Sequence, residues 1–261
     1  MKTTIRFFLT LTVCTMTHIA AAQFIQNQVI AHRGAWKADG LPQNSIASLQ
    51  RAIQLGCAGA EFDVHLTKDG VLVVNHDADF FGVDIGTATY ADLQAKKLSN
   101  GEAIPKAETY LSEGMKQRNT KLIFELKTSK LGKERTLYSA DLAVQLVKEL
   151  GAEEWVEYIA FDYDACKRII ERDPNAKVYY LNGDVDPEQA RRDGLYGLDY
   201  HFSIYKKNPT WIKEAKSLGL AINAWTVNTE EEMISLLNQS ADFITTDEPE
   251  LLLDVIQKRG K

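Results

Sequence analysis

The sequence predicts an α/β fold, a (β/α)8 TIM barrel with a short insertion after the hairpin of the second strand. Three observations support this prediction. Short apolar runs alternate with helix-like segments at intervals of roughly 20 to 40 residues, as in parallel βαβ units. Eight such runs occur, and polar side chains follow the ends of several of them. In a barrel, these strand ends meet at one mouth.

The first 22 residues are predicted to be a secretory signal peptide. Lys2 and Arg6 precede an apolar run over residues 7–13, and the segment closes on small residues with cleavage expected near Ala22. A membrane anchor is the weaker alternative, because the run is short and interrupted by threonines. A lipoprotein site at Cys14 is also weaker, because the preceding Val13 is bulky. We therefore expect a secreted or periplasmic protein.

The remaining chain, residues 23–261, is expected to form a single domain. Without Lys2 and Arg6 it carries 28 basic and 36 acidic residues, a formal charge of −8. This balance argues against a nucleic-acid-binding surface, which needs clustered positive charge. Cys57 and Cys166 could form a disulfide, but two buried thiols are the preferred interpretation. The oligomeric state is not predicted.

The strands are recognised by apolar runs rich in β-branched and aromatic residues. In order, they are predicted over residues 29–32, 60–64, 121–127, 158–161, 177–181, 197–201, 220–227 and 242–246. A ninth apolar run, residues 71–75, follows the second strand after a short turn. Such a connection favours an antiparallel hairpin over a crossover.

The helices are recognised by apolar residues at helical spacing and by end signals. The best example is residues 45–56, which stop at Gly56. Thr229 precedes three glutamates, as expected of a capped, acid-rich first turn. Helical patterns are predicted over residues 45–56, 137–151, 164–173, 210–219 and 229–239.

A cluster of acids is expected at the mouth of this barrel. Glu61 and Asp63 alternate with Phe62 and Val64, so both acids lie on one face of the second strand. Other polar residues at or just past strand ends are His32, Glu125, Lys127, His201, Trp225, Asn228 and Asp247. Paired charges of purely structural role are the alternative. A bound cation is the simpler way to neutralise several nearby carboxylates.

The motifs at these positions resemble those of the glycerophosphodiester phosphodiesterases. They are HRG (32–34), PQNS (42–45) in place of the family's PENT, GAEFDVHLTKDG (59–70), VVNHD (73–77), FELK (124–127), WTVN (225–228) and TTDEP (245–249). The resemblance implies a (β/α)8 barrel with a small insertion after the strand that ends in HD. Residues 78–110 look like a short form of that insertion.

The resemblance also implies that Glu61, Asp63 and Glu125 ligate one divalent cation, while His32 and His76 exchange protons with the substrate. The residue chemistry agrees, because a cation neutralises an anionic phosphodiester and imidazoles titrate near neutral pH. All-oxygen ligation favours Mg²⁺ or Ca²⁺. Structural histidines are the alternative.

Three further residues are candidates for binding substrate. Arg33 could grip phosphate oxygens, and Lys127 could add a point charge. Trp225 could line the pocket for the glycerol or alcohol moiety. The alternatives are an ion pair for Arg33 and a core position for Trp225.

Neighbouring residues are given supporting roles. Asn44 could position a loop or simply form a turn, and His65 is not expected to ligate the metal. Asp247 and Pro249 are interpreted as fixing a loop. Gln43 replaces the family's glutamate, which leaves the orientation of Arg33 in question.

The expected function is that of a secreted, metal-dependent phosphodiesterase that hydrolyses glycerophosphodiesters to sn-glycerol 3-phosphate and an alcohol. Its partner would be this small-molecule substrate, with no nucleic acid and no stable membrane insertion after signal cleavage. One alternative is a related barrel phosphodiesterase acting on intact phospholipids, although no amphipathic or basic docking stretch is evident. The other is a catalytically silent, ligand-binding barrel.

Overall fold

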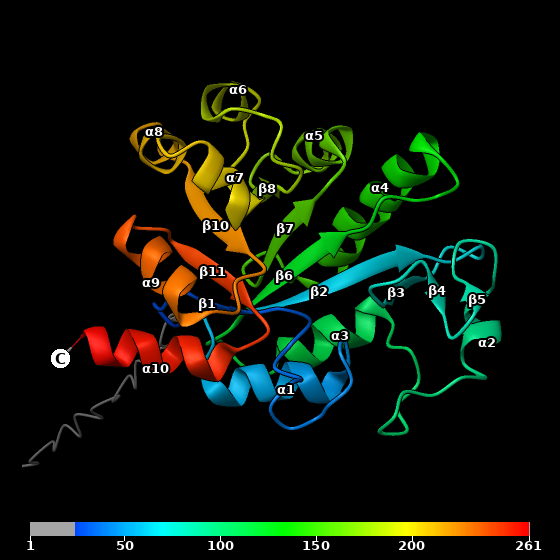
Figure 1. Ribbon diagram of the computed structural model, residues 1–261. Coiled ribbons are helices and arrows are strands. Elements are labelled where there is room, and N and C mark those ends of the chain that lie inside the picture. Colours follow the sequence, from blue (N-terminus) through cyan, green and yellow to red (C-terminus); the bar gives the residue numbers. More distant parts are fainter. Residues whose placement is uncertain (1–23, 261) are drawn as a thin grey trace, which may run out of the picture.

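The computed structural model describes residues 24–260, and they form a closed barrel of eight parallel strands (Figure 1). The predicted signal peptide lies outside the described residues. All eight predicted strands are present. They are β1 (Val29–Ala31), β2 (Gly59–Leu66), β6 (Lys121–Leu126), β7 (Val156–Ala160), β8 (Val178–Tyr180), β9 (Gly197–His201), β10 (Ala221–Trp225) and β11 (Phe243–Thr246). Because β1 pairs with both β11 and β2, the ring closes.

Helices between successive strands cover the outside of the barrel (Figure 1). They are α1 (Ile46–Leu55), α3 (Ala107–Gly114), α4 (Lys133–Leu150), α5 (Tyr163–Arg172), α6 (Pro187–Arg192), α7 (Phe202–Lys207), α8 (Trp211–Ser217), α9 (Glu230–Asn238) and α10 (Pro249–Arg259). The predicted end signals are confirmed: Gly56 ends α1 in the left-handed conformation, and the Thr229 side chain accepts from the Glu232 N–H.

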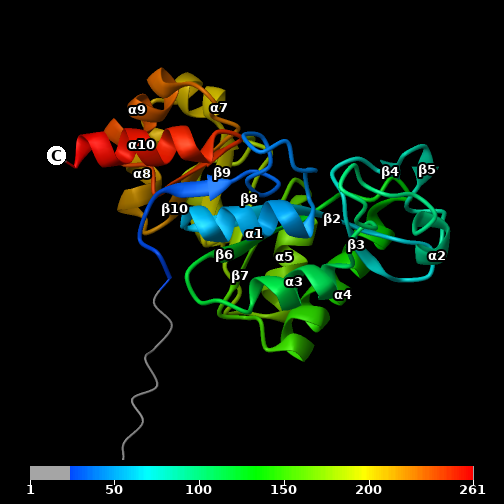
Figure 2. The same cartoon turned by 90° about the horizontal axis from the view of Figure 1, so that it is seen from below.

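The predicted hairpin and insertion are both present. Strand β3 (Leu72–Val74) pairs antiparallel with β2. Beyond it, β4 (Asp79–Phe80), β5 (Val83–Asp84) and α2 (Tyr90–Leu93) form a lobe beside the barrel (Figure 1). Figure 2 shows the same lobe on the side away from α10. Helix α3 already begins at Ala107, so the insertion is slightly shorter than the predicted residues 78–110.

The apolar core has one layer between the strands and helices and another inside the barrel. Phe62 of β2 belongs to the outer layer and stacks on Tyr110 of α3, with ring centroids 4.5 Å apart. The inner layer consists of Ile30, Ile123, Ile159, Tyr179 and Leu181. These side chains fill the barrel, so any pocket at the mouth has a closed floor.

Cys57 and Cys166, the two cysteines among the described residues, are buried and unbridged. This confirms their interpretation as thiols. Burial raises the pKa of Cys57 to about 12, which keeps the thiol protonated and unreactive. In the described part of the chain, no helix has the length and apolar character needed to cross a membrane.

Candidate active site

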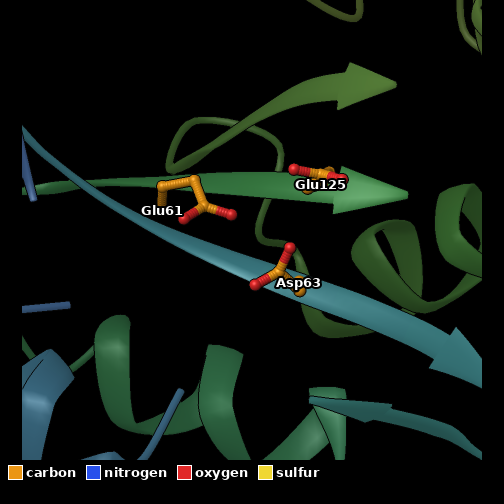
Figure 3. Close-up of side chains that lie close together, drawn as sticks. All are labelled: Glu61, Asp63 and Glu125. Atoms are coloured by element: carbon orange, nitrogen blue, oxygen red, sulfur yellow. The ribbon is translucent and has the colours of Figure 1, made fainter. Parts of the chain in front are cut away.

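Three carboxylates from the neighbouring strands β2 and β6 meet inside the barrel. Strand alternation turns Glu61 and Asp63 inward, while Glu125 lies beside Asp63 in the register of the two strands. One oxygen from each residue lies within 4.8 Å of the others. Figure 3 shows their carboxyl groups facing a common space. The predicted ligand set is therefore brought together.

The environment of these acids suits a bound cation. All three are buried, and burial together with the charges of Asp63 and Glu125 raises the pKa of Glu61 well above its ordinary value. Burial and the Asp63 charge likewise raise the pKa of Glu125 to about 7. The Oε1 atom of Glu61 has no hydrogen-bond partner. Buried carboxylates with an unpartnered oxygen fit a hard cation, which supplies the missing positive charge.

Lys127 provides part of the positive charge at this cluster. Its Nζ lies 3.0 Å from Asp63 Oδ1 and 2.7 Å from Glu125 Oε1. Burial alone would raise the pKa of Asp63, but Lys127, the nearby His76 and an Asn44 hydrogen bond hold it at about 2. Arg33 Nε also lies 3.6 Å from Asp63 Oδ2. Two cationic side chains thus face three acids, so the ionised cluster keeps a net negative charge that a divalent cation would balance.

The turn after β1 brings Arg33 to the acids. The Arg33 backbone N–H donates to Glu61 Oε2 at 2.8 Å, and its Nη1 donates to Gln43 Oε1 at 2.6 Å. Gln43 therefore still holds the guanidinium through its amide oxygen. Gly34 has φ +77°, and a Cβ there would approach Ser48 to 2.5 Å. Only glycine fits this turn without displacing its neighbour.

Asn44 fixes Asp63 through two hydrogen bonds. Its Nδ2 donates to Asp63 Oδ2 at 2.8 Å, and its Oδ1 accepts from the Asp63 backbone N–H at 3.1 Å. Asn44 adopts φ +57°, a left-handed conformation that asparagine tolerates better than most residues. Asn44 therefore forms a turn, as one alternative from the sequence suggested, and it also orients Asp63.

His32 is held by a residue to which the sequence assigned only a loop-fixing role. Its Nδ1 lies 2.7 Å from Asp247 Oδ1. Asp247 is held in turn by Asn228, whose Nδ2 donates to Asp247 Oδ2 at 2.8 Å. The signal that could have identified this role is the position of Asp247 directly after the last strand, which neighbours the first strand in any closed barrel.

His76 lies across the mouth at the end of the hairpin. Its Nδ1 lies 2.8 Å from Asp77 Oδ1, and its backbone carbonyl lies 3.0 Å from Nε2 of the buried His65. Burial, with the positive charges of Lys127 and Arg33, lowers the pKa of His76 despite the nearby Asp63. His65 supports the backbone at His76. It is not one of the residues whose ligand atoms meet in the acid cluster.

An apolar and aromatic wall completes the pocket opposite the acids. Trp225 lies edge-on to Phe161, with centroids 5.5 Å apart, and its indole Nε1 donates to the Asp199 carbonyl at 2.9 Å. The predicted mouth residue His201 contacts Ser203 and caps α7. The sequence pattern did not single out Asp199, although it shares a strand face with His201.

The pocket has a volume of about 110 Å³ and gathers most of the predicted site. It is lined by His32, Arg33, Glu61, His76, Glu125, Lys127, Ile159, Phe161, Leu181, Asp199, Trp225, Thr226 and Thr245. Of the eight predicted site residues, only Asp63 is absent from this lining. Its carboxylate is in contact with Asn44 and Lys127.

Comparisons with known proteins agree with this geometry. The chain is 32% identical over 252 residues to a glycerophosphodiester phosphodiesterase of Caldanaerobacter subterraneus subsp. tengcongensis, covering 89% of this chain and 98% of that protein. A crystal structure of a glycerophosphodiester phosphodiesterase from Parabacteroides distasonis superimposes with a TM-score of 0.88 and 44% identity, covering 92% of this chain and 100% of that one.

A more distant structure shares the fold. An Oleispira antarctica phosphodiesterase in complex with its product sn-glycerol 3-phosphate has a TM-score of 0.76 and 24% identity, covering 89% of this chain and 97% of that one. Residues 32–251 match the glycerophosphoryl diester phosphodiesterase family, and this range includes all eight predicted site residues. The chain therefore belongs to the glycerophosphoryl diester phosphodiesterase family.

Proposed function

We propose that this protein hydrolyses glycerophosphodiesters to sn-glycerol 3-phosphate and an alcohol, with the help of one divalent cation. The observation that carries the proposal is the meeting of Glu61, Asp63 and Glu125 with His32 and His76 around one pocket. Family membership and the named relatives support the same reaction.

The three carboxylates would hold Mg²⁺ or Ca²⁺, because each offers only oxygen ligands. When bound, such a cation neutralises phosphate charge and orients the phosphate oxygens. Lys127 and Arg33 lie at the pocket wall beside the acids and would bind the remaining phosphate oxygens. The phosphate would thereby be placed between the two histidines.

The two imidazoles are oriented for proton transfer. In each ring Nδ1 faces a carboxylate, Asp247 for His32 and Asp77 for His76, so this nitrogen would carry the proton in the neutral ring. Nε2 is then left for the substrate. One Nε2 would take the proton of the nucleophile, which is water or the glycerol hydroxyl beside the phosphate. If the hydroxyl attacks, water would then open the cyclic phosphodiester to give glycerol 3-phosphate. The other would protonate the leaving alcohol oxygen.

The proposal is tested by incubating residues 23–261 with a panel of glycerophosphodiesters and intact phospholipids, with either Mg²⁺ or Ca²⁺. A coupled assay measures glycerol 3-phosphate, and mass spectrometry measures phosphatidic acid. We expect release of glycerol 3-phosphate from the glycerophosphodiesters only. Release of phosphatidic acid from the intact phospholipids instead would favour the phospholipid alternative. No product from any substrate would favour a silent binding barrel.

We further propose that the protein is exported and that residues 1–22 are removed. The order of basic, apolar and small residues in that segment supports this proposal. Edman sequencing or mass spectrometry of the protein recovered outside the cytoplasm should give an N-terminus near Gln23. An intact Met1 in that fraction, or a lipid-modified Cys14, would contradict it.

A further inference from the structure

Asp199 is a buried carboxyl group in the pocket that the proposed reaction does not use. It lies on β9, is 1% exposed, and its Oδ1 has no hydrogen-bond partner. It lines the pocket together with Ile159, Leu181 and Thr245. A buried polar atom without a partner is costly, and such atoms often serve a ligand.

The surroundings hold this carboxyl in place but leave Oδ1 open. The Trp225 indole fixes the Asp199 backbone carbonyl at 2.9 Å. Neighbouring Asn223 uses its Nδ2 to donate to Thr245 Oγ1 at 2.8 Å, and its Oδ1 accepts from the Ala224 N–H. Burial raises the pKa of Asp199 to about 8, with the hydrogen bond from Asn223 opposing the rise and the charge of Glu125 adding to it. A protonated carboxyl can both donate and accept, as a hydroxyl ligand requires.

Asp199 faces the acid cluster across the barrel. In the ring of strands, β9 is separated from β2 by β8, β7 and β6, which places it halfway around. A phosphate held at Glu61 and Glu125 would therefore direct one arm of the diester toward Asp199. That arm ends on a closed floor, because the inner apolar layer fills the barrel below.

We propose that Asp199 binds the terminal hydroxyl of the substrate's glycerol moiety and thereby restricts the enzyme to diesters whose glycerol carries no acyl chain. This inference rests on the proposed function and specifies its substrate class. The glycerol is common to all the substrates, so it suits the closed end of the pocket. The variable alcohol is left to point out of the mouth. An acyl chain on the terminal hydroxyl would meet the floor and leave Asp199 Oδ1 unpaired.

The test compares three substrates that share choline as the leaving group, so that choline release reports all three. They are glycerophosphocholine, its analogue with hydrogen in place of the terminal hydroxyl, and a 1-acyl lysophosphatidylcholine. Wild-type protein should favour glycerophosphocholine over each of the other two by at least about 100-fold in kcat/KM, as expected of a site with a buried hydroxyl-binding group.

Asp199→Ala should lower kcat/KM for glycerophosphocholine by about 100-fold, mostly through KM, while changing the rate on the deoxy analogue by less than about threefold. Asp199→Asn should keep most of the preference, because an amide also donates and accepts. Glu157→Gln is the matched control. Glu157 is a buried acid inside the same barrel, bonded to Tyr179 and Lys177 and absent from the pocket lining.

The inference is overturned if wild type accepts the deoxy analogue or the lysophospholipid as well as glycerophosphocholine. Equal losses on glycerophosphocholine and the analogue in Asp199→Ala, or the same pattern in Glu157→Gln, would also overturn it. If Asp199→Ala does not fold, the wild-type and Asp199→Asn preferences decide the matter. Wild type that cleaves none of the three and releases no glycerol 3-phosphate from any other glycerophosphodiester would refute the proposed function as well, which distinguishes the two failures.

Discussion

Nδ1 of His32 lies 2.7 Å from Oδ1 of Asp247, a residue 215 positions later in the chain. The contact joins the ends of β1 and β11, which are paired in register as the first and last strands of the barrel. Closure of the barrel therefore places a carboxylate behind the candidate catalytic imidazole. The arrangement resembles the way many enzymes fix the tautomer and orientation of a histidine.

Asp247→Asn should lower kcat by about 10²-fold and change KM by less than about threefold. The amide cannot stabilise a positive imidazole, and it can favour the wrong tautomer. Steady-state kinetics measure both effects.

Asp77→Asn is the matched comparison, because Asp77 contacts Nδ1 of His76 but has a side chain that is 72% exposed. Exposed ion pairs are weak, so we expect a loss below about tenfold. If Asp247→Asn lowers kcat no more than Asp77→Asn does, Asp247 has only the loop role that the sequence suggested.

The two histidines should be separable by leaving group. Replacing the general acid with alanine should lower release of an alkyl alcohol by roughly 10²- to 10⁴-fold but spare much of the activity on a nitrophenyl diester, which leaves without a proton. Replacing the general base should lower both rates alike. Rates of His32→Ala and His76→Ala on both ester types therefore assign the roles. Equal residual rates for both variants on both esters would refute the division.

Metal-free protein should lose stability as the pH rises from about 5 to about 7. Burial raises the pKa of Glu125 from its ordinary 4.5 to about 7, so the folded chain binds this proton more tightly than the unfolded chain. The free energy of unfolding then falls with pH across this window, by about 3 kcal/mol for Glu125 alone. For a chain of this size that corresponds to a Tm lower by roughly 6–12 °C.

Saturating Mg²⁺ or Ca²⁺ should recover this loss at pH 7.5, because the cation binds the ionised, folded site. Glu125→Gln removes one titrating group and should make the decline between pH 5 and 7 shallower, leaving the part that comes from Glu61. Differential scanning calorimetry in chelator and in cation measures both. A decline that is identical in wild type and Glu125→Gln would show that other groups cause it.

Gly34→Ala should destabilise the turn that holds Arg33. The added Cβ would approach Ser48 to 2.5–2.7 Å, at a residue with φ +77°. We expect a cost of about 2–4 kcal/mol from strain and overpacking. Gly40→Ala is the matched control, since Gly40 also has a positive φ but no atom lies within 4 Å of the position that an added Cβ would take. Its cost should be about 1 kcal/mol. Equal unfolding free energies in urea for both variants would contradict the close approach.

The strands were predictable because each is a short buried run with strong β propensity. The helices were less predictable from the sequence. Helix α4 begins at Lys133 after Gly132, which offers no side-chain cap, and the predicted start was four residues later. Helix α7 has six residues, too few to show a helical period. Short or uncapped helices depend on packing against the barrel, which a local pattern does not encode.

Strand alternation was sufficient to place Glu61 and Asp63 on one inward face. The position of Glu125 beside Asp63 depends in addition on the register between β2 and β6, which is a property of the folded sheet. The roles of Asp247 and Asp199 were missed for the same reason, because both depend on how the strands assemble into the closed barrel. Asp247 meets a residue at the other end of the chain. Asp199 stands out only by burial and by its unpartnered oxygen, which are properties of the folded molecule.

The central claim is that Glu61, Asp63 and Glu125 hold one divalent cation on which phosphodiester hydrolysis depends. The most direct measurement titrates chelator-treated protein with Mg²⁺ or Ca²⁺ and follows heat of binding and glycerol 3-phosphate release in parallel. We predict one cation per chain and activity that rises with its occupancy. Asp63→Asn should weaken both together, because the cation loses one of its three charged ligands. Full activity in protein whose lack of metal is verified by elemental analysis would contradict the claim.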